Sequence, residues 1–306
     1  MRPRPDHPAS RGETGAILLE FALVLLVLYV TLFGALELGR AIFGGQLVQD
    51  AARVAARELA LVPLPPEATF EQALLDPRVK SQVYDSDYLV LDLDGLPGDL
   101  DDFFATLPVV NQMLRPLMIV DAYADDGGGV ARRLLRYPGA LLADPGSATG
   151  FTVQIPRVVS RDGDGAETIL WIPVVEEVKP SGHSEGPFSI LPASDLDLPR
   201  GVVALRVNYP YQAAALSGFR ASPEGPFEKN MANYIEARDS QVVALNAPLD
   251  GAAVLANDAP AGTYAGPYGL GRQLAIIRTL RPFRKLISAQ AVFRREVFAV
   301  REDRRR

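Results

Sequence analysis

The sequence of 306 residues contains no cysteine and only two histidines. The absence of thiols excludes disulfide bonds, thiolate nucleophiles and cysteine-ligated zinc or iron–sulfur centres. His7 lies close to the N-terminus, and His183 lies in a loop rich in Gly, Ser and Pro. A Ser-His-Asp triad would depend on His183, and its surroundings do not predict the strand-to-helix turn on which such a serine sits. We therefore expect no catalytic residue and no cofactor.

Regular metal-binding and phosphate-binding loops are also lacking. An EF-hand aligned on Gly95 would place Val90 at the first ligand position, and valine cannot ligate a cation. The glycines at 127–129 are not followed by the Lys-Ser/Thr of a phosphate loop. We name no metal ligand, although an irregular calcium site stays open against a solvated acidic loop. Its carboxylates would be those of Asp92, Asp94, Asp99, Asp101 and Asp102.

The charge distribution gives little sign of a nucleic acid partner. The net charge is −6, and basic side chains are concentrated after residue 272. Such a basic segment fits a solvated strand edge and tail, and the alternative is a surface for acidic partners. We predict no nucleic acid partner.

One long apolar run near the N-terminus stands out against these absences. Between residues 16 and 36 the only charged side chain is that of Glu20. About 20 residues at roughly 1.5 Å each cover the hydrocarbon core of a bilayer, so residues 16–36 are predicted to span a membrane. The following residues are amphipathic, and no proline occurs before Pro63. The helix is therefore expected to continue to about residue 62.

The charges beside the apolar run predict its orientation. Arg2, Arg4 and Arg11 precede it, and acidic and basic residues nearly balance after it. The positive-inside rule then makes residues 1–15 a cytoplasmic leader and residues 63–306 an extracytoplasmic domain. A cleaved secretory signal is the competing interpretation, but its apolar core is normally only about 7–15 residues long. We expect a single-pass protein of the cytoplasmic (inner) membrane.

Glu20 needs an explanation, because a carboxylate at the centre of a bilayer costs about 2.5–3.5 kcal/mol. In one interpretation Glu20 lies shallowly, among solvated headgroups. In the other, cleavage after Gly15 makes Ala16 a new N-terminus, and its α-amine pairs with Glu20 of the same chain or of the next subunit. Both interpretations stay open at this point.

Small residues recur four positions apart along the helix. This spacing lets helices approach one another closely, especially in lipid, although alanine is also simply a good helix former. We predict a helix-packing face formed by Ala35, Gly39, Ala41, Gly45, Ala51, Ala52, Ala55 and Ala56.

Beyond the helix, short strand and helix patterns alternate among many Pro and Gly residues. Apolar residues at every second position predict a strand at 202–211, and further strands are expected at 88–93, 117–123, 151–155, 169–178 and 287–300. Short helices are expected at 67–75, at 102–118 with a break at a proline, and at 226–238. The predicted fold class is α+β: a long N-terminal transmembrane helix, then a domain with an antiparallel sheet and a few short helices.

Three segments carry a family resemblance. RGETGAILLEFALVLLVLYVTLFGALELGR, with the later QDAARVAARELA, resembles the N-terminal signature of TadE-like proteins, the pseudopilins of tight-adherence (Flp-type) pilus systems. VVALRVNYPY and ISAQAVFRRE look like the late strand and the closing strand of that family. The matching residues of the first segment are Gly15, Glu20, Phe21, Glu37, Gly39, Arg40, Ala51, Ala52, Arg53, Ala55, Ala56 and Arg57.

The resemblance implies a function in pilus assembly or secretion. It implies cleavage by a prepilin peptidase between Gly15 and Ala16, with Glu20 and Phe21 near the new N-terminus and Glu20 in charge pairing between subunits. The implied partners are the lipid bilayer, other pilin-like subunits and the peptidase, and the protein is not expected to be an enzyme. The outer part is longer than a small pseudopilin needs. The alternative is thus a ligand-binding module or enzyme that uses a TadE-type anchor.

Overall fold

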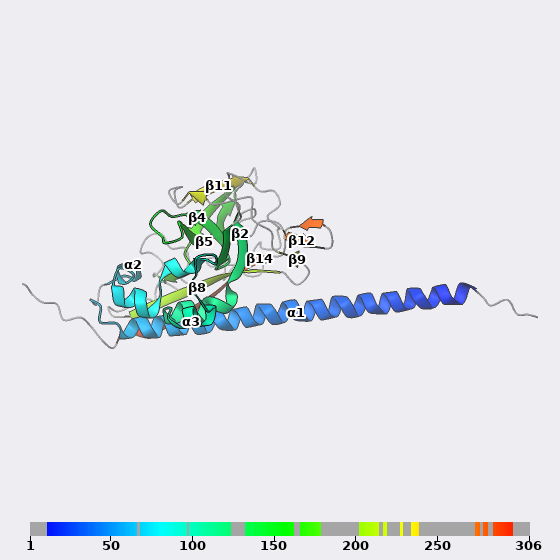
Figure 1. The fold of residues 1–306 in the computed structure, drawn as a ribbon, viewed down its shortest axis with the longest axis horizontal. Coiled ribbons are helices and arrows are strands. Elements are labelled where there is room, and N and C mark those ends of the chain that lie inside the picture. Colours follow the sequence, from blue (N-terminus) through cyan, green and yellow to red (C-terminus); the bar gives the residue numbers. More distant parts are fainter. Residues whose placement is uncertain are drawn as a thin grey trace, which may run out of the picture.

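The computed structural model describes residues 11–65, 68–96, 98–123, 132–161, 166–178 and 202–213, and the shorter segments 217–218, 227–228, 234–238, 273–275, 278–280 and 284–295. One helix, α1 (Arg11–Leu61), runs along the whole molecule (Figure 1). Its 51 residues correspond to about 75 Å. The N-terminal half projects alone, and the C-terminal half lies against the globular part of the chain. The helix ends where the sequence predicts, and it begins within the predicted leader.

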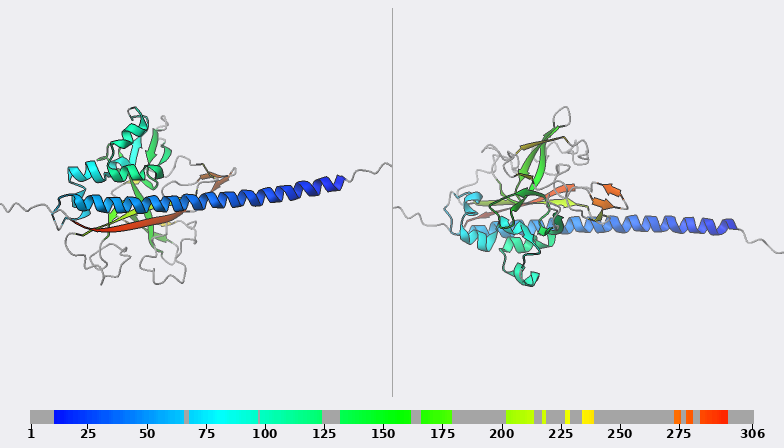
Figure 2. Two further views of the ribbon diagram at one scale, coloured as in Figure 1. Left: turned by 90° about the horizontal axis from the view of Figure 1, so that it is seen from below. Right: turned by 45° about the horizontal axis from the view of Figure 1, so that its top comes forward.

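The C-terminal half of α1 packs on a three-stranded sheet of order β14-β8-β7 (Figure 2). The two long strands, β8 (Val202–Gln212) and β14 (Arg284–Arg294), pair antiparallel over their full length, and β7 (Val175–Glu177) pairs with the middle of β8. β8 matches the strand predicted at 202–211. β14 matches the strand predicted at 287–300 as far as residue 294, and residues 296–300 lie outside the described part of the chain. The three segments that carry the family resemblance therefore lie together in space, as one helix and two strands.

The loop that follows α1 is tied to the end of β14. Arg295 is buried, and its guanidinium donates hydrogen bonds to the carbonyl oxygens of Pro65 and Ala68, at 2.8 Å for Ala68. Burial lowers the pKa of this guanidinium. β14 therefore runs in the same direction as α1, and β8 runs back toward the free half of the helix.

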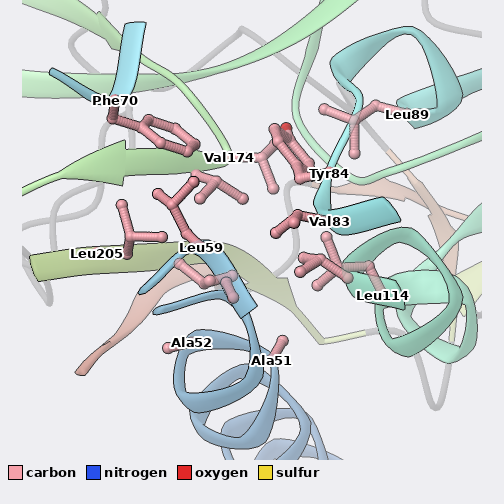
Figure 3. Packing of buried hydrophobic residues seen from close by; sticks show 14 of the residues in the cluster. Ala51, Ala52, Leu59, Phe70, Val83, Tyr84, Leu89, Leu114, Val174 and Leu205 are labelled. Carbon is pink, nitrogen blue, oxygen red and sulfur yellow. The ribbon is translucent and has the colours of Figure 1, made fainter. Parts of the chain in front are cut away.

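The main core is built on α1. Its buried residues recur at helical spacing and are mostly alanines: Val48, Ala51, Ala52, Ala55, Ala56 and Leu59. Figure 3 shows larger side chains above this face, among them Leu205 of β8, Val174, Tyr84 and Leu114. Because the alanines present little more than a methyl group, the strands and short helices come close to the helix axis.

Short helices form one side of this core. Thr69 caps the first of them and forms a capping box with Gln72, and Pro108 separates the two α-helices predicted as one broken helix at 102–118. The helix predicted at 67–75 is shorter in the structure. The elements are α2 (Phe70–Ala73), the π-helix η1 (Val79–Val83), the 3-10 helix η2 (Ser86–Leu89), α3 (Leu100–Ala105), α4 (Val109–Leu114) and the 3-10 helix η3 (Arg115–Leu117).

Three further sheets complete the described part of the chain. The first has the order β1-β3-β2, with β1 (Val90–Asp92), β2 (Ile119–Tyr123) and β3 (Arg132–Arg136). The second has the order β10-β4-β5-β6-β11, with β4 (Ala140–Ala143), β5 (Phe151–Arg161), β6 (Ala166–Ile172), β10 (Phe227–Glu228) and β11 (Tyr234–Arg238). The third has the order β13-β12-β9, with β9 (Ser217–Gly218), β12 (Gln273–Ala275) and β13 (Arg278–Leu280). Described strand pairs are antiparallel except β10 with β4, and the predicted α+β class is confirmed.

Two predictions about secondary structure are wrong. The helix predicted at 226–238 is replaced by β10 and β11, and Tyr234 and Ile235 of β11 pair with Leu170 and Ile169 of β6. The strand predicted at 169–178 is split into β6 and β7, which belong to different sheets and flank Pro173. The predicted loop that contains His183, residues 180–187, lies outside the described residues.

Candidate functional site

The exposed surface of α1 changes character along the helix. Between residues 17 and 43 its apolar side chains are exposed on nearly every side; Leu18 is 67% exposed and Phe43 is still 54% exposed. Gly44 is buried, and Val48 and the residues after it alternate between buried and exposed. Within the described residues α1 is the one helix long and apolar enough to cross a membrane. The chain thus carries an N-terminal apolar helix with the properties of a single-pass membrane anchor.

The predicted processing site lies near the start of this helix. Gly15 and Ala16 are helical, four and five residues after the first residue of α1. Glu20 and Phe21 are exposed, and among the described residues no cation lies within ion-pair distance of Glu20. A partner for Glu20 would therefore come from another molecule or from a new N-terminus, and this stays a prediction.

The structure reveals a contact that links the anchor to the sheet. The hydroxyl group of Tyr211, near the end of β8, donates a hydrogen bond of 3.0 Å to the carbonyl oxygen of Glu37 and also contacts the Glu37 carboxylate. Arg40 forms an ion pair with the same carboxylate at 3.2 Å. Glu37 and Arg40 were singled out only by the family resemblance, and no sequence pattern pointed to their partner in β8. We call Glu37, Arg40 and Tyr211 the junction.

Gly44 lets Tyr209, the other tyrosine of β8, reach the helix. A Cβ atom at Gly44 would lie 3.0 Å from Cε1 of Tyr209 and 3.8 Å from Cδ2 of Leu117. The same construction at Gly39 or at Gly45 meets nothing within 4 Å. Among these glycines of α1, the one that permits close approach is therefore Gly44, which sequence spacing alone did not identify.

The predicted helix-packing residues divide into two groups. Ala51, Ala52, Ala55 and Ala56 are buried within the chain, against its own strands and short helices. The other four are more accessible: Ala35 and Gly39 are exposed, and Ala41 and Gly45 are half-buried. Packing between subunits stays a prediction, and the accessible group is where a neighbouring helix could reach.

Three carboxylates of the acidic loop form ion pairs with arginines from elsewhere in the fold. Asp92 forms an ion pair with Arg132 at 2.8 Å, Asp94 pairs with Arg133, and Asp101 pairs with Arg115. The hydrogen bond and charge of Arg133 lower the pKa of the Asp94 carboxyl group. Asp99 caps α3 by accepting a hydrogen bond from the Asp101 N–H. Among the described residues no group of three or more acidic or histidine side chains could hold a metal ion, so nothing favours the irregular calcium site.

A second polar cluster lies on β7, β8 and β14. Glu176 accepts hydrogen bonds from Asn208 at 2.9 Å and from Arg206 at 3.4 Å, and Ser288 donates to Asn208 at 2.7 Å. Asn208 also donates to the carbonyl oxygen of Pro173. These side chains hydrogen-bond to one another, which is typical of a structural network.

His183 lies outside the described residues, as do its neighbours. Gly182, Ser184 and Gly186 have the spacing G-x-S-x-G that occurs around nucleophilic serines. The spacing alone is a weak signal, because the activity depends on a strand-to-helix turn and on a placed histidine and acid. It carries no structural argument for catalysis here.

We predict that Gly44→Val destabilises the fold, whereas Gly45→Val does not. The first variant forces branched carbon atoms into the Tyr209 ring, and overpacking of this kind typically costs about 1–3 kcal/mol. The second meets nothing within 4 Å. Urea unfolding of the full chain in detergent, followed by the fluorescence of its single tryptophan, measures both free energies. Equal losses for the two variants would contradict the close approach at Gly44.

A second prediction concerns alkaline pH. Burial raises the pKa of Tyr209 and of Tyr211, and the hydrogen bond to Glu37 raises that of Tyr211 further. Burial likewise raises the pKa of Tyr84 and of Tyr137. The fold therefore favours neutral hydroxyl groups, whereas unfolded tyrosine ionises near pH 10. This stabilisation is complete below about pH 10 and is lost as the pH rises through the folded-state values.

The measurement is the urea midpoint at a series of pH values from 8 to 11.5, with tyrosinate absorbance recorded in parallel. We expect a constant midpoint up to about pH 9–10 and then a fall that coincides with cooperative tyrosine ionisation. A midpoint that stays level throughout the series would contradict the buried neutral tyrosines.

Comparison with known proteins points to α1, the helix that also carries the exposed apolar stretch and the junction. No curated protein and no solved structure matches the sequence. The family model described as TadE-like protein matches residues 15–57, which run from the predicted processing site through the junction into the alanine face of α1. In its anchor helix, therefore, the chain is similar to TadE-like proteins.

Proposed function

We propose that the protein is a membrane-anchored, pseudopilin-like subunit that acts in the assembly of a tight-adherence type pilus or secretion apparatus. The proposal rests on α1, which is a single unbroken helix. Its apolar half is exposed, and its other half contributes buried residues to the core of the domain. The TadE-like match over residues 15–57 supports the same function. The role is structural, without enzymatic activity.

In this proposal the helix lies in the cytoplasmic (inner) membrane with its N-terminus inside. The arginines of the leader favour this orientation, which leaves residues 63–306 outside the cytoplasm. A prepilin peptidase cuts between Gly15 and Ala16, and the exposed apolar side chains contact lipid and the helices of other pilin-like subunits. Along the same surface, Ala35 and Gly39 are exposed and open to a neighbouring helix.

The alternative of a ligand-binding module or enzyme on a TadE-type anchor has no specific observation in its favour. It would need convergent polar groups that are free to bind, whereas Glu176 and Asn208 bond to each other at 2.9 Å. It would also gain from a linker that gives the module reach. We therefore propose no second function.

The processing step gives the first test. Mass spectrometry of the protein extracted from membranes should find an N-terminus at Ala16, with or without a methyl group. Gly15→Val should leave Met1 as the N-terminus, and Gly34→Val is the matched control in the same helix, because its Cβ meets nothing within 4 Å. A wild-type chain that retains Met1, or that is cut near residues 41–45, would overturn the proposal.

Charge pairing gives the second test. Glu20→Ala should abolish crosslinks between subunits while the chain stays in the membrane fraction. Removing one partner of a buried ion pair costs about 3–5 kcal/mol, so the crosslinked fraction should fall by about tenfold or more. Glu58→Ala, a carboxylate of the same helix outside the apolar stretch, is the control and should leave crosslinking unchanged. Undiminished crosslinking in Glu20→Ala would refute the pairing.

A further inference from the structure

Cations from distant parts of the sequence gather where α1 leaves its apolar stretch. Arg40 is the first basic residue of the helix after Arg11, and its side chain is 46% exposed. Lys285 is exposed near the start of β14 and is in register with Tyr211, whose hydroxyl group binds Glu37. The fold thus places Arg40 and Lys285 at one end of the sheet, the end nearest the free half of α1; we call these two residues the basic collar.

The level of the basic collar follows from the length of the apolar stretch. Residues 17–43 rise by about 40 Å along the helix, which is close to the thickness of a bilayer with its headgroup layers, about 40–45 Å. The hydrocarbon core alone is about 30 Å thick. From Glu20 to Glu37 the helix rises by about 26 Å, so the two carboxylates lie near the two edges of that core. The basic collar then lies in the layer of the lipid phosphates.

Glu37, Arg40 and Lys285 together carry one net positive charge. Glu37 is the acidic residue of the junction, and its carboxylate is engaged by Tyr211 and Arg40. Lys285 is in register with Tyr211, on β14, the strand that borders the helix (Figure 2). Guanidinium and ammonium groups at this depth reach headgroup phosphates with their long stems along the apolar boundary.

We propose that the basic collar binds the headgroups of anionic phospholipids in the leaflet next to the domain. The inference rests on the proposed membrane anchoring and goes beyond it, because it assigns a lipid class and the residues that select it. Arg40 and Lys285 belong to the helix and to the sheet, respectively. Their binding to the same headgroup layer holds the domain against the bilayer surface at a fixed height.

The test uses the full chain reconstituted in phosphatidylcholine vesicles that contain a trace of spin-labelled phosphatidylglycerol or spin-labelled phosphatidylcholine. The motionally restricted fraction of each label gives the lipid preference. We expect phosphatidylglycerol to be favoured by the wild-type chain and the double variant Arg40→Gln/Lys285→Gln to lower that preference by about fivefold or more. Salt at 1 M should have a similar effect, because it shortens the Debye length to about 3 Å.

The matched control is Arg53→Gln/Lys80→Gln, which removes two other exposed cations. Arg53 lies about 20 Å further along α1 than Arg40, about two Debye lengths at 0.1 M salt, so this variant should keep the wild-type preference. The leader arginines are present in both double variants, so any lipid preference that they cause is the same in both. Inorganic phosphate at constant ionic strength should leave the preference unchanged.

Each other outcome overturns the inference in a distinguishable way. Equal restriction of the two labels, or an equal loss in both double variants, would show that the basic collar selects no lipid while the anchor still inserts. Displacement by inorganic phosphate would identify a free anion as the ligand instead. A chain that fails to enter phosphatidylcholine vesicles would refute the membrane anchoring itself, and the proposed function with it.

Discussion

The structure depends on the close approach of one sheet to one helix. Ala51, Ala52, Ala55 and Ala56 offer a nearly flat surface on α1, and β8 and β14 lie on it along most of their length. Apolar burial at about 25 cal/mol per Å² favours the contact, and short side chains allow it to close without voids. The core of the domain is therefore built on the same helix whose N-terminal half has the properties of a membrane anchor. Stability of the domain and position of the anchor are set by the same residues.

This arrangement changes which small residues of α1 can contact another helix. Four-residue spacing of alanine and glycine favours contact between helices in lipid, but half of the predicted set is already covered by the chain's own strands. What remains for a neighbouring molecule is the stretch around Ala35 and Gly39, inside the apolar half. Gly44 lies at the boundary between the accessible small residues and those covered within the chain, because Tyr209 of β8 packs against it.

Sequence patterns predicted the elements that are long and regular. The apolar run and the absence of proline define α1, and the alternation in Val203, Leu205 and Val207 defines β8. The helix predicted at 226–238 failed because Tyr234 and Ile235 have helical spacing with earlier apolar residues, whereas pairing with β6 decides their conformation. Local spacing carries no information about a partner strand more than 60 residues away.

Side-chain pairing was less predictable still. The acidic loop resembled a cation site because the arginines that neutralise Asp92 and Asp94 lie about 40 residues further on, in β3. The contact between Glu37 and Tyr211 joins residues 174 positions apart, and the sequence offers only the presence of both in segments that resemble one family. Such contacts depend on topology, and topology was predicted only as far as an antiparallel sheet.

The continuity of α1 also bears on what the protein can do. A tethered enzyme or binding module benefits from a flexible linker, because the linker gives it reach over the membrane surface. Here the helix passes from the apolar stretch into the core without a break, Tyr211 fastens the sheet to Glu37, and Arg295 fastens the far end of the sheet to the loop after α1. A displacement of the anchor along the bilayer normal therefore moves the domain by the same distance. Rigid coupling of this kind suits the proposed subunit, which is packed into an assembly.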